Sequence, residues 1–525
     1  MQVFRSRRSR FVLSGAALIV ALPLVIATTN GASAAVTAPL VLNPNSVVRV
    51  GNSIPLACLD PGTSSSVLAD PNGKLMFDYL IARNPGKNGS SVLSPDLATS
   101  WSFGANFLRL NLRKGVKFQD NTAFNAAAVV QNFTRDKTLG AYGAAKLISF
   151  VTDVVAVSPY VVRYDTTGPG LPELPAILSM TPGVILSPTS FSSNNECNDP
   201  IGAGPYKVQS YVAGSTLTLT RFNGYWNRKA QGAKQFIINY IGGDDTRLNA
   251  LLTKQEDIVN VRPFQAATAR KNKSLKTYAV TMPQFLGLFV TNNVSPLDNP
   301  LVRQAINVCL NRKGIVNATE GGLPTPATQP FLKGTLGYDP SISDYPYSVT
   351  QGKALLAQAG YPNGVTFTLG VYSALSEFVT NTNAIQGSLA QCGITVQIID
   401  DAGNIFGDWL GGKFNAVYFG WSPVPDPSLE VNTLFMPTGL WNPGKQTPAS
   451  LVSLENAAEN SVGAAARSAD YMAISNIVVN QSLDIPLYWD VSVMTMNKCV
   501  VGWKPGSIWT NINWSGVGMA KNCKP

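Results

Sequence analysis

The sequence predicts an α/β protein, and three observations support that class. Over residues 365–420, runs rich in Val, Ile and Phe alternate with helical patterns, as in an α/β lobe. Residues 201–226 predict a tight turn that leads into a β-hairpin, because Leu217 and Leu219 alternate with threonines after a turn rich in Gly and Pro. With 525 residues, the chain is too long for one ordinary core, so two or three domains are expected.

The charge of the chain does not indicate nucleic-acid binding. Lys and Arg outnumber Asp and Glu by 40 to 30, a formal charge of +10. Four arginines lie within residues 5–10 and no acid precedes Ala34, so a chain without that segment carries 10 − 4 = +6. This charge is spread without basic runs, and no nucleic-acid partner is expected. Charged residues make up 13% of the chain, about half the usual share, which suits an exported protein.

Residues 1–34 have the pattern of a signal peptide. The basic residues 5–10 precede an apolar run from Phe11 to Ala27, and Ala32-Ser33-Ala34 offers small residues for cleavage. Arg7-Arg8 leaves a twin-arginine export route open beside the general secretory one. No later stretch is long and apolar enough to span a bilayer, so an exported, extracytoplasmic location is predicted.

Six cysteines in an exported chain indicate three disulfides, with fifteen possible pairings. No cysteine directly follows the apolar run, so no lipoprotein cysteine is expected at the end of the signal. Leu56-Ala57-Cys58 looks like a lipoprotein box, but no long apolar core precedes it.

The residue content argues against catalysis. The chain has no histidine, which removes Ser-His and Cys-His nucleophilic sites and the usual ligands of zinc, copper and haem. It has no phosphate-binding P-loop sequence either. The acidic pairs Asp244-Asp245 and Asp400-Asp401 keep a secreted, carboxylate-dependent hydrolase as the alternative class. Adjacent aspartates at loop starts usually act as solvated caps, so no enzyme activity is expected. Because the chain has no histidine, no metal or cofactor is expected either.

The first elements are short. Residues 47–50 predict a strand that runs on to Leu59-Asp60-Pro61, and 74–82 predict a helix. The next elements are a half-exposed strand at 108–112, a helix at 125–133 capped by Asn125, and strands at 154–157 and 161–164.

After the hairpin, strands and helices alternate. We expect a strand at 236–241, a helix at 244–254 with Leu248, Leu251 and Leu252 on one side, and a strand at 285–291. Asn299 caps the next helix and Pro300 begins it, with an apolar stripe of Val302, Ala305, Ile306 and Cys309. Thr350 caps a helix at 351–359 that ends at Gly360. Further elements are strands at 365–371, 393–399 and 414–420, and helices at 381–391 and 467–479.

Several phrases in this order resemble one known family. They are Leu59-Asp60-Pro61, the block SPDLATSW followed by LRKGVKFQDN at 94–121, the turn and hairpin IGAGPYKVQSY with Tyr225-Trp226, the helix LVRQAINVCLNR at 301–312, LLAQAGYPNG at 355–364, and IPLYW at 485–489. Over nearly all of the mature chain they resemble extracytoplasmic solute-binding proteins of the peptide/nickel ABC-importer family. Two departures, Asn121 in place of the usual Gly and Ala128 in place of an acid, concern structure only.

The resemblance implies a bilobal periplasmic-binding-protein-like fold with an additional small lobe and a ligand cleft between the two main lobes. The expected parts are a signal peptide (1–34), lobe I (36–84, 198–282 and 487–525), small lobe II (85–197) and lobe III (283–486). Hinge strands would lie near Gln284 and Pro486. The implied function is capture of a peptide or other small solute by a monomer that delivers it to an ABC permease.

The expected ligand contacts are Ser65, Ser66, Trp421, Ser422, Asp426, Trp441, Tyr488 and Trp489. Trp421 ends an apolar strand and opens a Pro-rich turn, the edge at which α/β lobes bind ligands. Aromatic rings with few charges suit a ligand that is partly apolar or sugar-like. In peptide-binding members, an aspartate that corresponds to Pro423 here holds the peptide's amino terminus. A modified peptide, a glycosidic compound and a metal chelate therefore stay open beside a simple peptide.

With these lobes, the expected disulfides are Cys58–Cys197, Cys309–Cys392 and Cys499–Cys523. Cys58 ends the first strand, and Cys197 precedes the return of the chain into the same lobe. The second pair lies at the ends of two apolar helical stripes, and the third lies within the C-terminal segment.

Overall fold

The computed structural model describes residues 39–54, 58–63, 72–86, 91–139, 144–168, 170–191, 195–343, 345–421, 424–508 and 510–523. The predicted signal peptide and three predicted ligand contacts, Ser65, Ser66 and Ser422, lie outside these ranges. Within them, no helix combines the length and the apolar character needed to cross a membrane.

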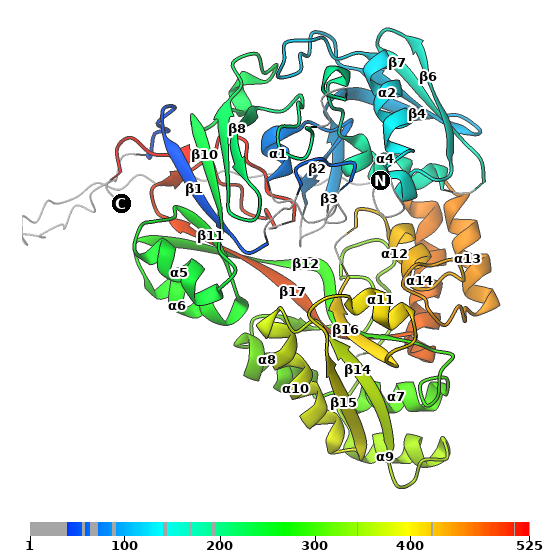
Figure 1. Ribbon diagram of the computed structural model, residues 1–525. Coiled ribbons are helices and arrows are strands. Elements are labelled where there is room, and N and C mark those ends of the chain that lie inside the picture. Colours follow the sequence, from blue (N-terminus) through cyan, green and yellow to red (C-terminus); the bar gives the residue numbers. More distant parts are fainter. Residues whose placement is uncertain are drawn as a thin grey trace, which may run out of the picture. The chain divides into compact units, whose positions relative to one another are not determined.

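Eleven strands form one mixed sheet (Figure 1). Five strands at one end form the first half-sheet: β8 (Tyr206–Val212), β9 (Thr216–Arg221), β10 (Gln235–Tyr240), β1 (Val47–Asn52) and β11 (Ile258–Val261). Three strands at the other end form the second half-sheet: β16 (Ala416–Gly420), β14 (Val365–Val371) and β15 (Ile394–Asp400). The short β13 (Thr325–Pro326) pairs with β17 beside this path.

Two long strands, β12 (Leu275–Val290) and β17 (Asp484–Asn497), connect the half-sheets (Figure 1). They pair antiparallel, and β12 continues to β16 while β17 continues to β11. Their register breaks between Thr281 and Phe285 of β12, where the predicted hinge residue Gln284 lies. The sequence predicts a strand only from residue 285 onward, because the first ten residues of β12 lack a clear apolar alternation.

The close approach of these two strands requires a glycine. A Cβ atom at Gly287 would lie 2.4 Å from the carbonyl oxygen of Ile485. Any other residue here would push β12 and β17 apart, so the sequence fixes how closely the two connecting strands pack.

Each half-sheet contains parallel strands whose carboxyl ends lead into helices. In the first, β1 runs parallel to β10 and β11, and α5 (Asp244–Leu252) and α6 (Ala266–Lys271) follow. In the second, β14 runs parallel to β15 and β16, and α10 (Ser376–Ala390), α11 (Ile405–Leu410) and α12 (Pro427–Leu434) follow. Ligand crevices in α/β sheets lie at such carboxyl ends.

A separate four-stranded sheet contains β4 (Ala98–Phe103), β5 (Phe107–Leu112), β7 (Val161–Thr166) and β6 (Val151–Ser158), in that order. Helix α2 (Ala126–Asp136) packs against it, and Asn125 caps the helix as predicted by accepting a hydrogen bond from Ala128 N. Asn121 adopts the expected left-handed conformation, with φ of 69°. The short elements around this sheet are α3 (Ala144–Leu147), η2 (Leu171–Glu173), α4 (Leu174–Ile177), η3 (Thr181–Gly183) and η4 (Pro188–Ser190).

The helix predicted at 74–82 is wrong. The structure has only α1 (Gly73–Met76), followed by β2 (Ile81–Pro85), which pairs with β3 (Ser91–Pro95). Leu75, Met76, Phe77, Leu80 and Ile81 are all buried. An apolar run that is buried all round has no periodicity to separate helix from strand.

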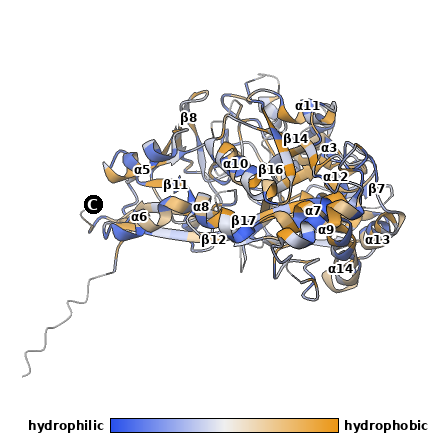
Figure 2. Cartoon of the chain, turned by 90° about the horizontal axis from the view of Figure 1, so that it is seen from below, coloured by the Kyte–Doolittle hydropathy of each residue, from blue (hydrophilic) through white to orange (hydrophobic). Residues whose placement is uncertain are grey.

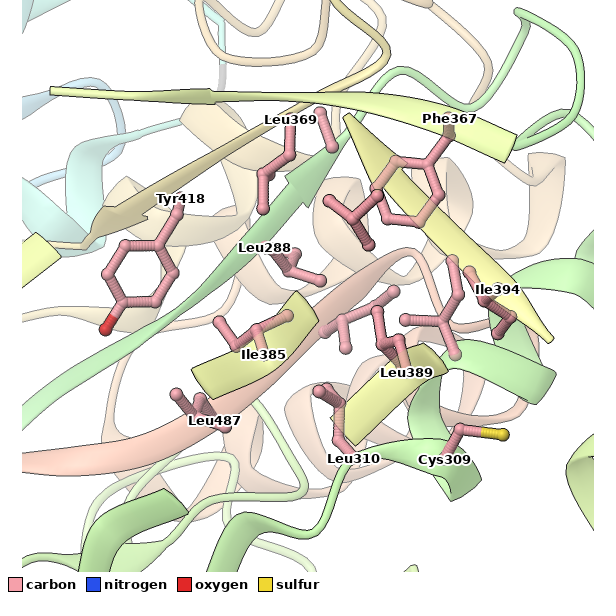
Figure 3. Close-up of a cluster of buried hydrophobic side chains, with 14 of the residues drawn as sticks. Leu288, Cys309, Leu310, Phe367, Leu369, Ile385, Leu389, Ile394, Tyr418 and Leu487 are labelled. Carbon is pink, nitrogen blue, oxygen red and sulfur yellow. The ribbon is translucent and has the colours of Figure 1, made fainter. Parts of the chain in front are cut away.

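Helices α7 (Pro300–Cys309), α8 (Arg312–Glu320), α9 (Val349–Gln358) and α10 surround the core of the second half-sheet. Figure 3 shows part of this core, where Leu288, Phe367, Ile385 and Leu389 lie close together. Hydropathy colouring shows both orange and blue residues on α7 and α9, as expected for amphipathic helices (Figure 2). Asn299 caps α7 as predicted. The predicted cap of α9 is wrong, because Ser348 caps this helix in place of Thr350.

Two further helices, α13 (Ala449–Glu459) and α14 (Ala464–Gln481), pack against each other beside α12. The last strands, β18 (Val500–Val501) and β19 (Gly518–Met519), form a small pair near the C-terminus. Next to it, Leu42 forms a β-bridge with Ala520, and Lys521 N donates to Val41 O at 2.9 Å. The beginning and the end of the described chain therefore lie side by side.

All three expected disulfides are present: Cys58–Cys197, Cys309–Cys392 and Cys499–Cys523. The first ties residues near β1 to the segment that precedes the hairpin of β8 and β9, and the second joins α7 to the end of α10. The pairing inferred from the order of the predicted elements is therefore confirmed.

Candidate functional site

The candidate site lies where the two half-sheets meet across β12 and β17. Two predicted contacts, Tyr488 and Trp489, are neighbours in β17. Tyr488 packs into the core that contains Leu288, whereas the Trp489 ring lies edge-on to Phe285 with a centroid distance of 6.1 Å on the other face. Because side chains alternate along a strand, these two residues cannot line the same face of the sheet. The site therefore has two sides, which we describe in turn.

Aromatic rings gather on the Trp489 side. We call them the aromatic cluster: Phe285, Phe289, Phe406, Phe419, Trp421, Trp441 and Trp489. Trp421 follows β16, and its ring lies edge-on to Trp441 with a centroid distance of 5.3 Å. Trp441 in turn stacks on Phe406 at 4.4 Å. The structure therefore brings together three of the predicted contacts, Trp421, Trp441 and Trp489, although Trp421 and Trp489 are each only 6% exposed.

The acids on this side of the molecule are buried and hard to ionise. Burial raises the pKa of Glu430 well above its ordinary value, and Asp484 adds to that rise while Trp421 acts against it. Burial also raises the pKa of Asp484, to about 7. Glu430 therefore adds little negative charge to the aromatic cluster at neutral pH, which suits the partly apolar ligand expected from the sequence.

Asp426, another predicted contact, is engaged within the protein. It caps α12, where Ser428 N donates to Oδ1 at 3.0 Å. Arg467 binds both carboxylate oxygens, at 2.6 and 2.7 Å. Both oxygens are thus used inside the fold, and this geometry favours a structural role for Asp426 over the predicted role in ligand binding.

A polar pocket of about 580 Å³ lies on the Tyr488 side, and loops and helices beside both half-sheets line it. Its lining includes the start of α5, Arg262 after β11, the end of α8 and the start of α10. The sequence analysis did not find this pocket. The available signals were Gly242-Gly243 after β10 and Arg262-Pro263 after β11, two turns at the carboxyl ends of parallel strands.

An ion-pair network lies in the wall of the polar pocket. Arg262 donates to Glu320 at 2.6 Å and to Glu377 at 3.3 Å. The same oxygen of Glu320 accepts from the Tyr488 hydroxyl at 3.0 Å and from Asn381 at 3.2 Å. Burial acts to lower the pKa of Arg262, but Glu320 and Glu377 raise it overall. Tyr488 therefore reaches the pocket only through Glu320.

The polar pocket is acidic. Four carboxylates line it, and Arg262 is the only cationic side chain among the lining residues; the carboxylates belong to Asp244, Asp245, Glu320 and Glu377. Asp244 pairs with Arg247, and Asp245 accepts from Gln265 at 2.8 Å. A solute group that enters this pocket meets carboxylate and hydroxyl acceptors, which favours an amine or another hydrogen-bond donor.

The acidic pairs that raised the hydrolase alternative serve local structure. Asp244 and Asp245 begin α5. Asp401 accepts hydrogen bonds from Gly403 N and Asn404 N, each at 2.9 Å, and these bonds keep its pKa below the ordinary value. Neither pair shows a nucleophile and a base in contact, so nothing in this geometry supports a hydrolase.

Comparison with known sequences identifies relatives. Residues 92–441 match the family described as bacterial extracellular solute-binding proteins, family 5 Middle. The chain is 28% identical over 499 residues to the glutathione-binding protein GsiB of Escherichia coli O6:K15:H31, covering 91% of this chain and 94% of the relative. It is 29% identical over 436 residues to GsiB of Pectobacterium atrosepticum, covering 79% and 82%.

Solved structures share the fold. AgaA of A. tumefaciens R10, in complex with agropinic acid, matches with a TM-score of 0.79 and 23% identity, covering 91% of this chain and 99% of that chain. DppA of Helicobacter pylori, in complex with the peptide STSA, matches with a TM-score of 0.78 and 24% identity, covering 91% and 98%. NikA of Staphylococcus aureus, in complex with Ni(L-His)2, matches with a TM-score of 0.75 and 18% identity, covering 89% and 100%.

Proposed function

Because the chain belongs to the bacterial extracellular solute-binding proteins of family 5, whose bilobal α/β fold it shares, we propose that it captures a peptide-like solute between its main lobes and delivers it to an ABC permease. The protein acts outside the cytoplasm as a monomer, after export by its N-terminal signal. It carries out no reaction on the solute.

The lobes in this proposal are lobe I (36–84, 198–282 and 487–525), small lobe II (85–197) and lobe III (283–486). Their boundaries are consistent with the sheet, since the first half-sheet belongs to lobe I and the second to lobe III. The register break before Phe285 in β12 lies beside the proposed boundary between residues 282 and 283, which is consistent with a change of lobe there. The hinge is the β12–β17 pair, around Gln284 and Pro486.

One observation carries the proposal. The carboxyl ends of β11 and β16 lie against the middle of β17 and β12, and segments that follow strands of both half-sheets line the same polar pocket. A solute held there contacts both lobes at once, so it binds the closed arrangement better than the open one. Differential binding of this kind is what couples capture to closure.

The solute class follows from the two sides of the site. The aromatic cluster offers apolar surface, and the polar pocket offers carboxylate acceptors. A solute with an apolar or sugar-like part and a basic or donor-rich part fits both. Short or modified peptides have this chemistry, and relatives are named for glutathione and peptides, while a relative bound to agropinic acid keeps a glycosidic or sugar-acid solute as the second candidate.

Native mass spectrometry of the purified, exported protein tests the proposal. We expect a non-covalent passenger of a few hundred daltons that leaves on mild activation and rebinds in calorimetry. The Asp401→Asn variant should bind the passenger as the unaltered protein does. Absence of a passenger, together with no binding from a library of short peptides, would contradict capture. Conversion of a bound compound that is lost in Asp401→Asn would support the hydrolase.

A further inference from the structure

A buried contact joins small lobe II to lobe III. The 3-10 helix η2 of lobe II packs against α13 of lobe III, and the Ser428 hydroxyl of α12 bonds to the Glu173 carboxyl of η2. Leu429 of α12 also lies in the hydrophobic core of the small lobe. Glu173 and Ser428 are 5% and 0% exposed, so no solvent separates the two lobes here. Opening the lobes about β12 and β17 must break this contact.

The contact contains more carboxyl groups than it can hold in ionised form. We call it the acid latch: Glu173, Asp426, Ser428, Glu455, Glu459 and Arg467. Four carboxyl groups face one arginine, and that arginine is already bound to Asp426. Tyr471 is the remaining titratable group there, and its hydroxyl accepts from Arg467 at 2.7 Å. Glu455 is fully buried, and neither of its oxygens has a hydrogen-bond partner among the described residues.

The hydrogen-bond geometry itself calls for a proton. The Ser428 oxygen lies against Glu173 and also 2.9 Å from Oδ1 of Asp426. A serine hydroxyl has only one hydrogen to donate, so it cannot satisfy two ionised carboxylates. Asp426 is paired with Arg467, which leaves Glu173 as the group that carries the additional proton and donates it to Ser428.

From this geometry we propose that closing the acid latch takes up a proton on Glu173, so that the closed, solute-holding state is favoured as pH falls. The proposal rests on the proposed function, because it identifies the latch with closure of the lobes around a solute. In the open state, η2 moves away from α12 and α13, and Glu173 regains water and its charge.

The pKa shifts of the latch residues also favour closure as pH falls. Burial raises the pKa of Glu173 to about 8. Burial raises the pKa of Glu455 to about 9, with Glu459 and Glu173 adding to the rise, and burial also raises the pKa of Glu459. Burial acts to lower the pKa of Arg467, but Asp426 and Tyr471 raise it overall.

The direction in which pH changes the closed-to-open ratio follows from the raised pKa of Glu173. In the open lobe, Glu173 titrates near its ordinary value of 4.5, and in the closed latch near 8. Between these values closure binds up to one proton, so the closed-to-open ratio falls by as much as about tenfold for each unit that pH rises. Below about pH 4.5, the closed-to-open ratio no longer depends on the protonation of Glu173.

Energy transfer between dyes on the two lobes tests the latch without any solute. Val157 of β6 and Val462 before α14 are 47% and 54% exposed and can be changed to labelled cysteines in the full chain. We expect the closed-to-open ratio to rise tenfold or more from pH 8 to pH 6. Glu173→Gln, which mimics the protonated side chain, should close the lobes at pH 8 and flatten the profile. Asp153→Asn removes an exposed carboxylate of the same lobe and should leave the profile unchanged.

Three results would overturn the latch: a ratio independent of pH, a Glu173→Gln profile equal to that of the unaltered protein, or a Ser428→Ala protein that closes as readily as the unaltered one. Ser428→Ala provides this test even where the Glu173 variant folds poorly. A pH-dependent ratio in a protein that binds no solute would support the latch and contradict the proposed function. Solute binding by a protein whose closed-to-open ratio does not change with pH would support the proposed function and contradict the latch.

Discussion

Arg262 and Glu320 form an ion pair between the two half-sheets, with Nη2 of the arginine 2.6 Å from Oε1 of the glutamate. Arg262 directly follows β11, and Glu320 ends α8. Their side chains are only 16% and 1% exposed. The pair therefore links lobe I to lobe III in the proposed division, beside the hinge strands and under the polar pocket.

Removing one member of this pair should be costly. Arg262→Met leaves Glu320 buried without its cation, and we expect the free energy of unfolding to fall by about 3–5 kcal/mol in urea denaturation. Glu320→Gln added to it should restore part of the loss, because the uncompensated charge is then gone. Lys413→Met breaks a pair with Asp408 in which the lysine side chain is 56% exposed, and should cost far less because solvent screens that pair. Equal losses in the two single variants would contradict the buried role of Arg262.

Trp421→Ala should reduce both stability and solute affinity. The Trp421 ring is 6% exposed and packs within the aromatic cluster. Truncation of a buried tryptophan costs about 3–5 kcal/mol. Loss of an aromatic contact in the site should weaken binding about tenfold or more, at about 1–3 kcal/mol. Thermal melting and calorimetry on one sample separate the two effects. Phe264→Ala, at a ring that is 47% exposed, is the control and should leave the melting midpoint nearly unchanged.

Two helical glycines should respond in opposite ways to alanine. A Cβ atom at Gly352 of α9 would lie 2.0 Å from Sγ of Cys309, inside the Cys309–Cys392 disulfide. Gly387 of α10 has nothing within 4 Å of that position. Gly387→Ala should therefore stabilise the protein by about 0.5–1 kcal/mol, as helix propensity predicts, while Gly352→Ala should destabilise it. A stable Gly352→Ala protein with both cysteines still bridged would show that α9 can move away from the disulfide.

The buried Asp136 should make stability depend on pH in the opposite sense to most carboxylates. Burial raises its pKa to about 8, with Arg135 opposing and Asp60 adding to the rise. The folded state then holds a proton that the unfolded chain releases above about pH 4, so stability is greatest below that pH and falls as pH rises toward 8. The slope from one such group is at most about 1.4 kcal/mol per pH unit. Asp136→Asn should remove this slope between pH 5 and pH 8, and the exposed Asp153→Asn should keep it.

Patterns that depend on one residue and its neighbours in the chain could be predicted. Asn125 and Asn299 cap their helices because each offers a short acceptor just before an apolar stripe. The strand at 365–371 has the predicted bounds, since its apolar residues alternate throughout. The disulfide pairing followed from the lobes that the family resemblance implied, together with the place of each cysteine in its element.

Features that depend on distant parts of the chain could not be predicted. Nothing near Arg262 in the sequence points to Glu320 or Glu377, which come from two later helices. The acid latch likewise joins Glu173 to residues more than two hundred positions away. Thr350 and Ser348 are both good caps, and only the turn geometry selects Ser348. Tyr488 and Trp489 were assigned to one cleft because both are aromatic, although strand geometry alone separates them.

The neighbouring chain ends have a practical consequence for rearranging the gene. Because Leu42 bridges Ala520 and Lys521 N donates to Val41 O, a short linker can join the two ends of the described chain without crossing the molecule. New ends could then be placed at the exposed turn around Val462, between α13 and α14. In such a circular permutant both new ends belong to the proposed lobe III, so a reporter domain fused there would sense movement of that lobe while the proposed lobe I contains no free end.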